Sequence, residues 1–266
     1  MTPGLFAKRG KTIIGMAHIG ALPGSPLFDP AAGVPKLIDD VVADVGRLQA
    51  GGVDGILFGN ENDRPYVFAA PAEGIAAMAA VVQAAKSVLT VPFGVDYLWD
   101  PKASVAIGAA AGASFVREIF TGVFASDMGL WEPDGAGAVR LRRQMGRQDM
   151  KLLFNINAEF AHPLDGRAIE LRARSAVFSS LADVLLVSGP ITGTPADQGV
   201  LRTVCEAITD VPVLANTGVS LDNVEAVLSV ASGAIVGTHF KAGGITWNPV
   251  DGDRVRRFMD RVATLR

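Results

Sequence analysis

The sequence predicts a single (β/α)8 barrel, a TIM barrel, over residues 1–266, and three observations indicate this fold. The length of 266 residues suits one eight-unit barrel, which typically needs ~250 residues. Short apolar runs alternate with longer helical patterns along the whole chain, as expected for parallel βαβ units. Neither a linker nor a low-complexity stretch divides these units. A doubly wound open sheet is the main alternative, but eight evenly spread units with a terminal helix favour a closed barrel.

Each predicted strand is a short apolar run. In order, the strands are residues 11–17, 53–58, 91–97, 114–120, 150–157, 183–189, 211–218 and 233–238. Residues 36–52 and 255–266 show apolar side chains at intervals of three and four, the pattern of helices that cover a barrel. The long connection over residues 120–133 follows the fourth strand. It is a lid candidate, because loops of that length in a compact domain are often functional.

The composition limits the classes of partner. The chain is 49% hydrophobic with a mean hydropathy of +0.32, but no run reaches the ~20 apolar residues that a membrane-spanning helix needs. The net charge is −3 and no basic stripe is present, so nucleic acid is not an expected partner. Cys205 is the only cysteine, which excludes an intramolecular disulfide and a cysteine-rich metal site. A cytoplasmic protein that binds small molecules is therefore expected.

Polar residues gather where the predicted strands end, which is the face that carries the chemistry in (β/α)8 barrels. The candidate catalytic residues there are His18, Asp63, Asp96, Glu118 and Glu159. The candidate substrate-binding residues are Asn60, Asn62, Asn155, Asn157, Ser188, Asn216 and Lys241. Carboxylates held close together raise one another's pKa, which prepares one of them for acid–base catalysis. The same oxygens suit Mg2+, and the sequence leaves this choice open.

A structural role is the alternative for each of these residues, because strand ends also cap helices. Asp100 before Pro101 and Thr194 before Pro195 both resemble a helix N-cap followed by Pro at the first helical position. Trp99 is large enough to line a pocket, but packing in the core explains it equally well. The motifs of serine hydrolases, zincins, P-loop ATPases and Rossmann enzymes are absent from the sequence.

Small residues after the last three strands predict a phosphate-sized anion site. Such residues let backbone N–H groups approach an anion, and many barrels bind a substrate phosphate with the loops after their last two strands. Lys241 offers a neutralising positive charge nearby. The candidate phosphate-binding residues are Gly193, Thr194, Thr217, Gly218, Gly237 and Thr238.

Four segments resemble the BtpA family, which also includes the SgcQ proteins: IIGMAHIGALPGSP, GGVDGILFGNENDRPY, TGVFASDMGL and IVGTHFK. The resemblance implies a barrel related to the ribulose-phosphate-binding barrels, and one branch of the family is associated with photosystem I biogenesis. The segments DYLWDP and NAEFAHP depart from the pattern of many members and favour the SgcQ-like branch. The matching motif residues are His18, Asn62, Asp63, Thr121, Gly122, Asp127, Gly218, Gly237 and Lys241.

The sequence is compatible with two functions, one catalytic and one non-catalytic. The first is an enzyme that acts on a small phosphorylated metabolite, such as a sugar phosphate or nucleotide fragment, by lyase, isomerase or hydrolase chemistry. The second is a non-catalytic barrel that assists the assembly or stability of another complex, as in photosystem I biogenesis. We favour the enzyme, because polar residues concentrated at eight strand ends are costly to keep in a scaffold. We also expect a homo-oligomer. Mg2+ is the one cofactor that the carboxylate and amide side chains at the strand ends suggest.

Overall fold

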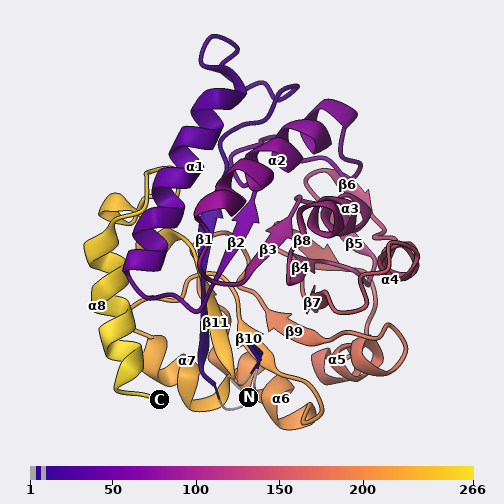
Figure 1. Cartoon of the computed structure of the whole chain (residues 1–266). Coiled ribbons are helices and arrows are strands. Elements are labelled where there is room, and N and C mark those ends of the chain that lie inside the picture. Colours follow the sequence, from indigo (N-terminus) through magenta and orange to yellow (C-terminus); the bar gives the residue numbers. More distant parts are fainter. Residues whose placement is uncertain (1–3, 7–9) are drawn as a thin grey trace.

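Eight parallel strands form a closed barrel in the computed structural model, which describes residues 4–6 and 10–266 (Figure 1). The strand order around the barrel is β1-β11-β10-β9-β7-β4-β3-β2, so β1 pairs with both β2 and β11 and closes the ring. This confirms the predicted fold class and all eight predicted strands. Their bounds are β1 Thr12–His18, β2 Gly55–Gly59, β3 Phe93–Asp96, β4 Phe115–Glu118, β7 Lys151–Asn155, β9 Val184–Val187, β10 Val213–Ala215 and β11 Gly233–Val236.

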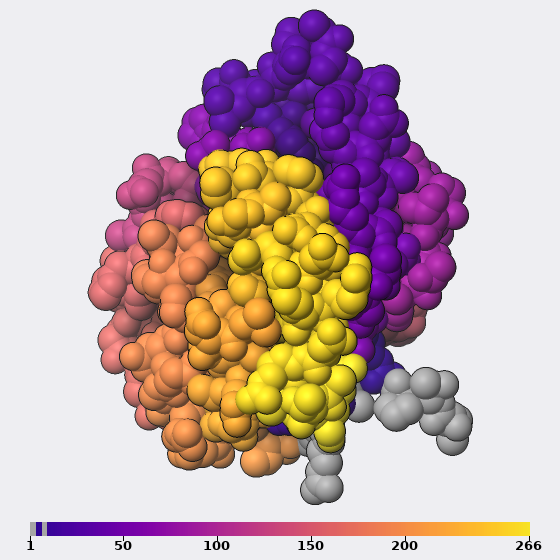
Figure 2. All heavy atoms as spheres, turned by 90° about the vertical axis from the view of Figure 1, so that its left-hand side faces the viewer, coloured from indigo at the N-terminus to yellow at the C-terminus, as the bar shows by residue number. Residues whose placement is uncertain are grey.

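Helices alternate with these strands and surround the barrel (Figure 1). The last helix, α8, packs against the first, α1, so that these two helices lie side by side (Figure 2). The helices are α1 Gly33–Ala50, α2 Ala72–Ala85, α3 Pro101–Ala111, α4 Gly135–Gln144, α5 Ile169–Phe178, α6 Gln198–Ala207, α7 Val224–Val230 and α8 Gly252–Ala263, and the short 3-10 helices are η1 Lys86–Val88, η2 Thr238–Phe240 and η3 Ala242–Gly244. No helix among the described residues is long and apolar enough to cross a membrane.

The two predicted helix caps have different outcomes. Asp100 caps α3 as expected, because its carboxylate accepts the backbone N–H groups of Lys102 and Ala103. The second prediction is wrong: α6 begins only at Gln198, and Asp197 is its cap. Thr194 instead offers its carbonyl oxygen to the Thr217 hydroxyl at 2.9 Å, so it ties two loops together.

Side-chain alternation along the strands sets the direction of the polar residues. Successive side chains on a strand point to opposite faces, so the residue two positions after an inward apolar side chain also points inward. The barrel interior is filled by apolar residues such as Met16, Phe115 and Leu214. The inward columns then end in polar residues: His18 (β1), Asp96 (β3), Arg117 (β4), Asn155 (β7), Ser188 after β9 and Asn216 after β10.

The connection over residues 120–133 is an ordered hairpin. Its strands, β5 (Phe124–Ser126) and β6 (Gly129–Trp131), pair antiparallel, and β8 (Ala161–Pro163) adds a third strand beside β5. Phe124 and Trp131 face each other across the hairpin, and both are buried. Trp131 also packs against Trp99, with ring centroids 5.0 Å apart. The segment predicted as a loop therefore forms two of the three strands of a small sheet, which packs against Trp99 through Trp131.

Candidate active site at the mouth of the barrel

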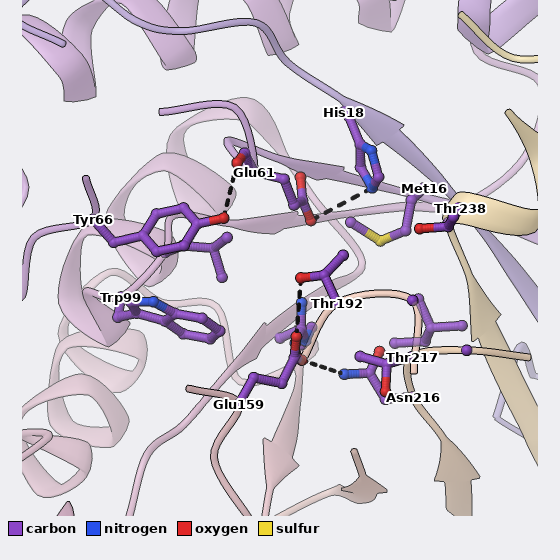
Figure 3. Close-up of a pocket in the computed structure, with 16 residues that line it drawn as sticks. Met16, His18, Glu61, Tyr66, Trp99, Glu159, Thr192, Asn216, Thr217 and Thr238 are labelled. Carbon is purple, nitrogen blue, oxygen red and sulfur yellow. Dashed lines mark hydrogen bonds and ion pairs between the residues drawn. The ribbon is translucent and has the colours of Figure 1, made fainter. Parts of the chain in front are cut away.

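A pocket opens at the C-terminal ends of the barrel strands, where the sequence placed the chemistry (Figure 3). It holds about 460 Å3 of space not filled by protein atoms, part of it open to solvent. Predicted site residues in its lining are His18, Glu159, Gly193, Asn216, Thr217, Gly218, Gly237 and Thr238. The lining also includes residues that were not predicted as site residues: Glu61, Tyr66, Arg117 and Thr192, with Trp99 as an aromatic wall.

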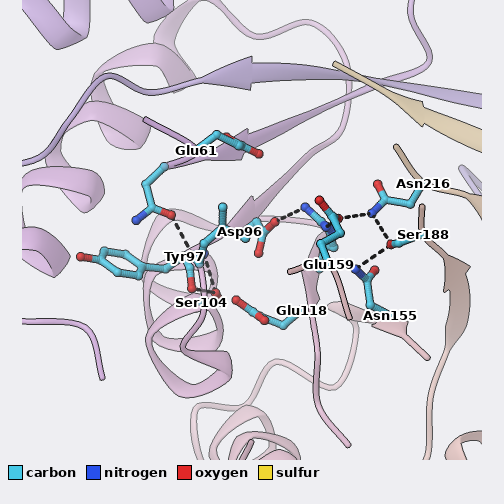
Figure 4. A network of polar contacts seen from close by, with 12 residues as sticks. Glu61, Asp96, Tyr97, Ser104, Glu118, Asn155, Glu159, Ser188 and Asn216 are labelled. Carbon is cyan, nitrogen blue, oxygen red and sulfur yellow. Dashed lines mark hydrogen bonds and ion pairs between the residues drawn. The ribbon is translucent and has the colours of Figure 1, made fainter. Parts of the chain in front are cut away.

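Arg117 is the central positive charge of the site and pairs with Asp96 and Glu159, two of the carboxylates labelled in Figure 4. Its Nη1 donates to Asp96 Oδ2 at 2.7 Å and its Nη2 donates to Glu159 Oε1 at 2.8 Å. Asp96, Arg117 and Glu159 come from neighbouring parts of β3, β4 and the end of β7, and all three are buried. A buried guanidinium with two carboxylate partners is fixed in place, since each bond is charge-assisted. Arg117 thus orients Glu159 toward the pocket.

A third carboxyl group, that of Glu118, lies beside these ion pairs. Glu118 is fully buried, its Oε2 accepts the backbone N–H of Ile119 at 2.7 Å, and its carboxyl group lies beside that of Asp96. Two carboxyl groups can share a hydrogen bond only if one is protonated. Burial and the Asp96 charge raise the pKa of Glu118 well above its ordinary value, so Glu118 holds the proton. Burial raises the pKa of Asp96 to about 6, although Arg117 opposes the shift.

Glu61 and His18 form a pair on the opposite wall of the pocket (Figure 3). Glu61 Oε1 lies 3.8 Å from His18 Nε2. Burial, followed by the Asp96 charge, raises the pKa of Glu61 to about 8, so Glu61 is largely protonated at neutral pH. Burial lowers the pKa of His18 well below its ordinary value, with Lys241 adding to the effect. His18 is therefore neutral, and its Nδ1 donates to the Thr246 carbonyl at 3.3 Å, which leaves Nε2 unprotonated.

Glu159 projects into the pocket from the wall opposite Glu61 (Figure 3). Its Oε2 accepts the Thr192 hydroxyl at 3.4 Å, and Asn216 Nδ2 lies 3.4 Å from its Oε1. Burial raises the pKa of Glu159 above its ordinary value, although Arg117 opposes the shift. Asn216 and Asn155 both donate to the Ser188 hydroxyl oxygen, at 2.9 and 3.1 Å. Asn155, Ser188 and Asn216 therefore form one hydrogen-bond network, and Asn216 connects it to Glu159 (Figure 4).

The predicted anion loops meet at another side of the same pocket. Gly193, Gly218, Gly237 and Thr238 all line it, and within the described ranges their backbone N–H groups donate to no protein acceptor. Gly218 has a φ of +59°, and a Cβ there would lie 2.1 Å from Pro195 N, so only glycine allows these two loops to approach. Four free N–H groups around one cavity are the donor set that an oxyanion requires.

Other predicted residues lie outside this pocket. Asp63 accepts the backbone N–H of Leu22 at 3.0 Å and the Asn60 amide at 3.2 Å, so it links the turns after β1 and β2. Asn157 exchanges two hydrogen bonds with the Ser188 backbone, at 2.6 and 2.9 Å. Thr194 acts through its carbonyl, which accepts the Thr217 hydroxyl.

Asn62 and Lys241 line a different cavity, between α1 and the segment around Trp247. Lys241 is 1% exposed, and its Nζ donates to Asp44 Oδ2 of α1 at 3.0 Å. Its charge is therefore compensated by α1 instead of facing the anion loops. His18 borders both cavities.

Metal binding finds limited support in the side-chain arrangement. Within residues 4–6 and 10–266, no three histidine, cysteine or carboxylate side chains are grouped closely enough to hold a metal ion. Mg2+ often binds through one or two carboxylates together with a substrate phosphate, and Glu159 with the anion loops fits only that mode. The proton transfers proposed below are therefore assigned to protein side chains.

Glu61 and Arg117 lie among the polar residues at the predicted strand ends, but neither was chosen as a candidate site residue. A signal for Glu61 was present at Gly59: a Cβ at this position of β2 would lie 2.6 Å from Glu61 Oε1. The glycine thus leaves room for the Glu61 carboxyl group in the barrel mouth. Arg117 could have been found from alternation, because it lies two residues after the inward Phe115 on β4.

Comparisons with known proteins agree with this architecture. The BtpA family model matches residues 9–264. The sgc region protein SgcQ of Escherichia coli K12 is 44% identical over 256 residues, with 96% of each chain covered. The photosystem I biogenesis protein BtpA of Synechocystis is 29% identical, with 94% of this chain and 88% of that protein covered.

Solved structures share the fold at low sequence identity. Phosphoribosyl anthranilate isomerase from Thermus thermophilus superposes with a TM-score of 0.58 at 14% identity, covering 96% of this chain and 100% of that one. GGGPS from Thermoplasma volcanium gives a TM-score of 0.53 at 14% identity, with 97% and 92% covered. At these identities the likeness concerns the barrel alone.

Proposed function

This chain belongs to the BtpA family and is 44% identical to an SgcQ protein, and we propose that it is an enzyme acting on a small phosphorylated metabolite. The observation that carries the proposal is that one pocket combines two kinds of group. Backbone N–H groups without a protein acceptor line one side of it, and the carboxyl groups of Glu61 and Glu159 face each other across it. The N–H groups take the phosphate, and the carboxyl groups move protons on the remainder of the substrate. One structural neighbour, phosphoribosyl anthranilate isomerase, is named for a phosphorylated compound, which is consistent with this use of the fold.

The two carboxyl groups have different partners, which suits them for opposite roles. Glu61 keeps its proton up to a pH of about 8 and is the general acid. Glu159 is held by Arg117 and is the general base, with Thr192 and Asn216 fixing its orientation. Proton removal on one side of a substrate and proton delivery on the other is the chemistry of isomerases and lyases.

The retained protons also limit the negative charge near the phosphate site. With Glu61 and Glu118 protonated and His18 neutral, the negative charges that remain are those of Asp96 and Glu159, and Arg117 neutralises one of them. If all four of these carboxyl groups were ionised, they would repel a phosphate dianion bound in the same pocket strongly. The buried, proton-holding carboxyl groups are therefore compatible with an anionic substrate.

A charge substitution at Gly193 tests phosphate binding without disturbing the loop. A Cβ at Gly193 meets only Thr238, at 3.5 Å or more, and Asp and Asn both tolerate its φ of +83°. Gly193→Asp places a negative charge in the anion site, and Gly193→Asn is its uncharged isostere. In a thermal-shift screen against inorganic phosphate, ribose 5-phosphate, glycerol 3-phosphate and AMP, a ligand at ~100 times its Kd stabilises by ~2.7 kcal/mol.

We expect the wild type and Gly193→Asn to be stabilised by at least one phosphorylated compound, and Gly193→Asp to lose that stabilisation. The compound with the largest shift is then used as substrate. Turnover of that compound should fall at least a hundredfold in Glu61→Gln, while its stabilising effect is retained. Absence of any phosphate-dependent shift in the wild type would contradict the proposal.

The alternative function is assistance in the assembly of another complex. It is supported by the 29% identity with the Synechocystis protein, whose name assigns it to photosystem I biogenesis. A barrel that no phosphorylated compound stabilises, and that co-purifies from its native cells with one membrane complex, would favour this alternative. We also propose that the protein is cytoplasmic and forms a homo-oligomer.

A further inference from the structure

A second cavity lies beside α5 and shares no lining residue with the barrel-mouth pocket. We call it the α5 cavity. It holds about 370 Å3 of space not filled by protein atoms, part of it open to solvent. One wall is the segment Thr121–Phe124 after β4, the start of the TGVFASDMGL motif, and the facing wall is α5 with Arg172 and Ser175. The proposed catalytic pocket makes no use of this part of the motif.

Arg172 brings a positive charge that is only partly compensated to the α5 cavity. Its Nε and Nη1 are buried and donate to no acceptor in the described part of the chain. The neighbouring carboxylate is Asp165, whose Oδ1 is 3.8 Å from Nε, too far for a hydrogen bond. Asp165 already accepts Arg167 Nη2 at 2.7 Å and Nε at 3.1 Å. One carboxylate therefore serves two guanidinium groups, and the excess charge belongs to Arg172.

Further donors surround the same space. The hydroxyl groups of Thr121 and Ser180 both line the cavity, and neither is bonded to any described residue. The backbone N–H of Gly122, which has a φ of +109°, also finds no acceptor within residues 4–6 and 10–266. The lining thus offers several donors and one carboxylate, Asp165, which Arg167 neutralises. Buried donors left without acceptors are unfavourable, so an acceptor from outside the chain would stabilise them.

We propose that the α5 cavity binds a small oxyanion, either a phosphate or a carboxylate group, with Arg172 as its principal donor. The planar fork of a guanidinium matches the oxygens of both groups. The hydroxyl of Thr121 and the N–H of Gly122 complete the donor set from the opposite wall. The site is separate from the proposed catalytic pocket, so its occupancy does not depend on whether that pocket turns over a substrate.

The test follows the Arg172 side chain directly in the full chain. The Nε–Hε resonances of 15N-arginine-labelled protein are recorded during titrations with inorganic phosphate and with acetate. Gly193→Asp serves as the background, so that phosphate at the barrel mouth does not contribute. We expect the Arg172 resonance to shift and saturate with one of the two probes, which identifies the oxyanion class.

Equilibrium dialysis with the same probe gives the control series. Arg172→Gln should weaken binding by about tenfold or more, since it removes a charged donor pair, and Arg172→Lys should weaken it less. Arg174→Gln changes an exposed arginine two residues along α5 and should bind as the parent does. An Arg172 resonance that neither probe shifts, or unchanged binding in a folded Arg172→Gln variant, would overturn the proposal. If that variant fails to fold, the resonance titration of the unmutated arginine decides.

Discussion

Asp96 and Glu118, on the neighbouring strands β3 and β4, are fully buried carboxyl groups, and each keeps one oxygen without a hydrogen-bond partner among the described residues. Asp96 is the charged member because Arg117 donates to it at 2.7 Å, and Glu118 is the protonated member because no cation bonds it within the described residues. Both residues were candidate catalytic groups, and neither lines the pocket. The roles that their geometry supports are the positioning of Arg117 and, through it, of Glu159.

Amide substitutions at these two positions should therefore differ in stability. The amide side chain introduced by Glu118→Gln is close in shape to a protonated Glu118 and can donate to Asp96, so this variant should lose about 1 kcal/mol or less of unfolding free energy. Asp96→Asn removes a charge from a buried ion pair and should cost about 3–5 kcal/mol. Urea denaturation at pH 7 measures both values. Equal losses in the two variants would mean that Glu118 is ionised.

Close approach of two loops at Gly218 gives a second prediction. Ala at this position adds a Cβ that would lie 2.1 Å from Pro195 N and also imposes a left-handed φ on a residue with a side chain. Gly146→Ala is the matched control, since Gly146 has a φ of +70° with nothing near its missing Cβ. The control should lose about 1–2 kcal/mol, from the backbone alone.

Gly218→Ala should lose more than the control, by a further ~1–3 kcal/mol, because the loop after β9 must move. That movement also carries Gly193 away from the anion site, so phosphate should no longer stabilise the variant. Comparable losses in the two variants, with phosphate stabilisation retained in Gly218→Ala, would contradict the close approach.

The barrel and the position of its working face could be predicted because both depend on local patterns. Alternating apolar runs and helical periods lie within short windows of the sequence, and the strand ends follow from them. His18 and Asn216 were found in this way, because each is the polar residue that follows an apolar run. The cap of α6, Asp197, was missed because Thr194 and Asp197 both precede the helical pattern. The first residue of a helix is uncertain by a few positions in such a case.

The pairing of charges could not be predicted, because it depends on residues far apart in the sequence. Lys241 was expected near the anion, but its partner is Asp44, 197 positions away on α1. Glu61 and Asp63 follow the same strand, and only the course of the turn decides that Glu61 enters the pocket while Asp63 binds Leu22. Turn geometry of this kind is set by tertiary contacts that the sequence pattern does not contain.

The expected homo-oligomer has a testable surface on α5. Phe178, the last residue of this helix, is 89% exposed, and Leu171 lies two turns earlier on the same face. If this face joins copies of the chain, Phe178→Asp should shift the protein toward the monomer in sedimentation analysis with little change in its melting temperature. Val88→Asp, at an exposed valine outside this face, should leave the assembly unchanged. A wild-type protein that sediments as a monomer at high concentration would contradict the expectation.

Glu61 gives a prediction on pH and stability. Its pKa is about 8 in the folded protein, against an ordinary value of 4.5. Between these two pH values the folded protein holds a proton at Glu61 that the unfolded chain has released. Rising pH therefore favours the unfolded state, and this loss of stability is complete once the pH exceeds the folded pKa. The full range corresponds to at most about 5 kcal/mol.

The measurement is the unfolding free energy of wild type and Glu61→Gln at pH 5 and pH 8. Gln cannot ionise, so the variant should gain stability relative to the wild type by a few kcal/mol between the two pH values. Glu132→Gln, at an exposed carboxylate, should follow the wild type at both. Parallel curves for wild type and Glu61→Gln would show that Glu61 ionises normally in the folded protein. A carboxyl group with an ordinary pKa could not serve as the general acid at neutral pH, so the same result would remove Glu61 from that role.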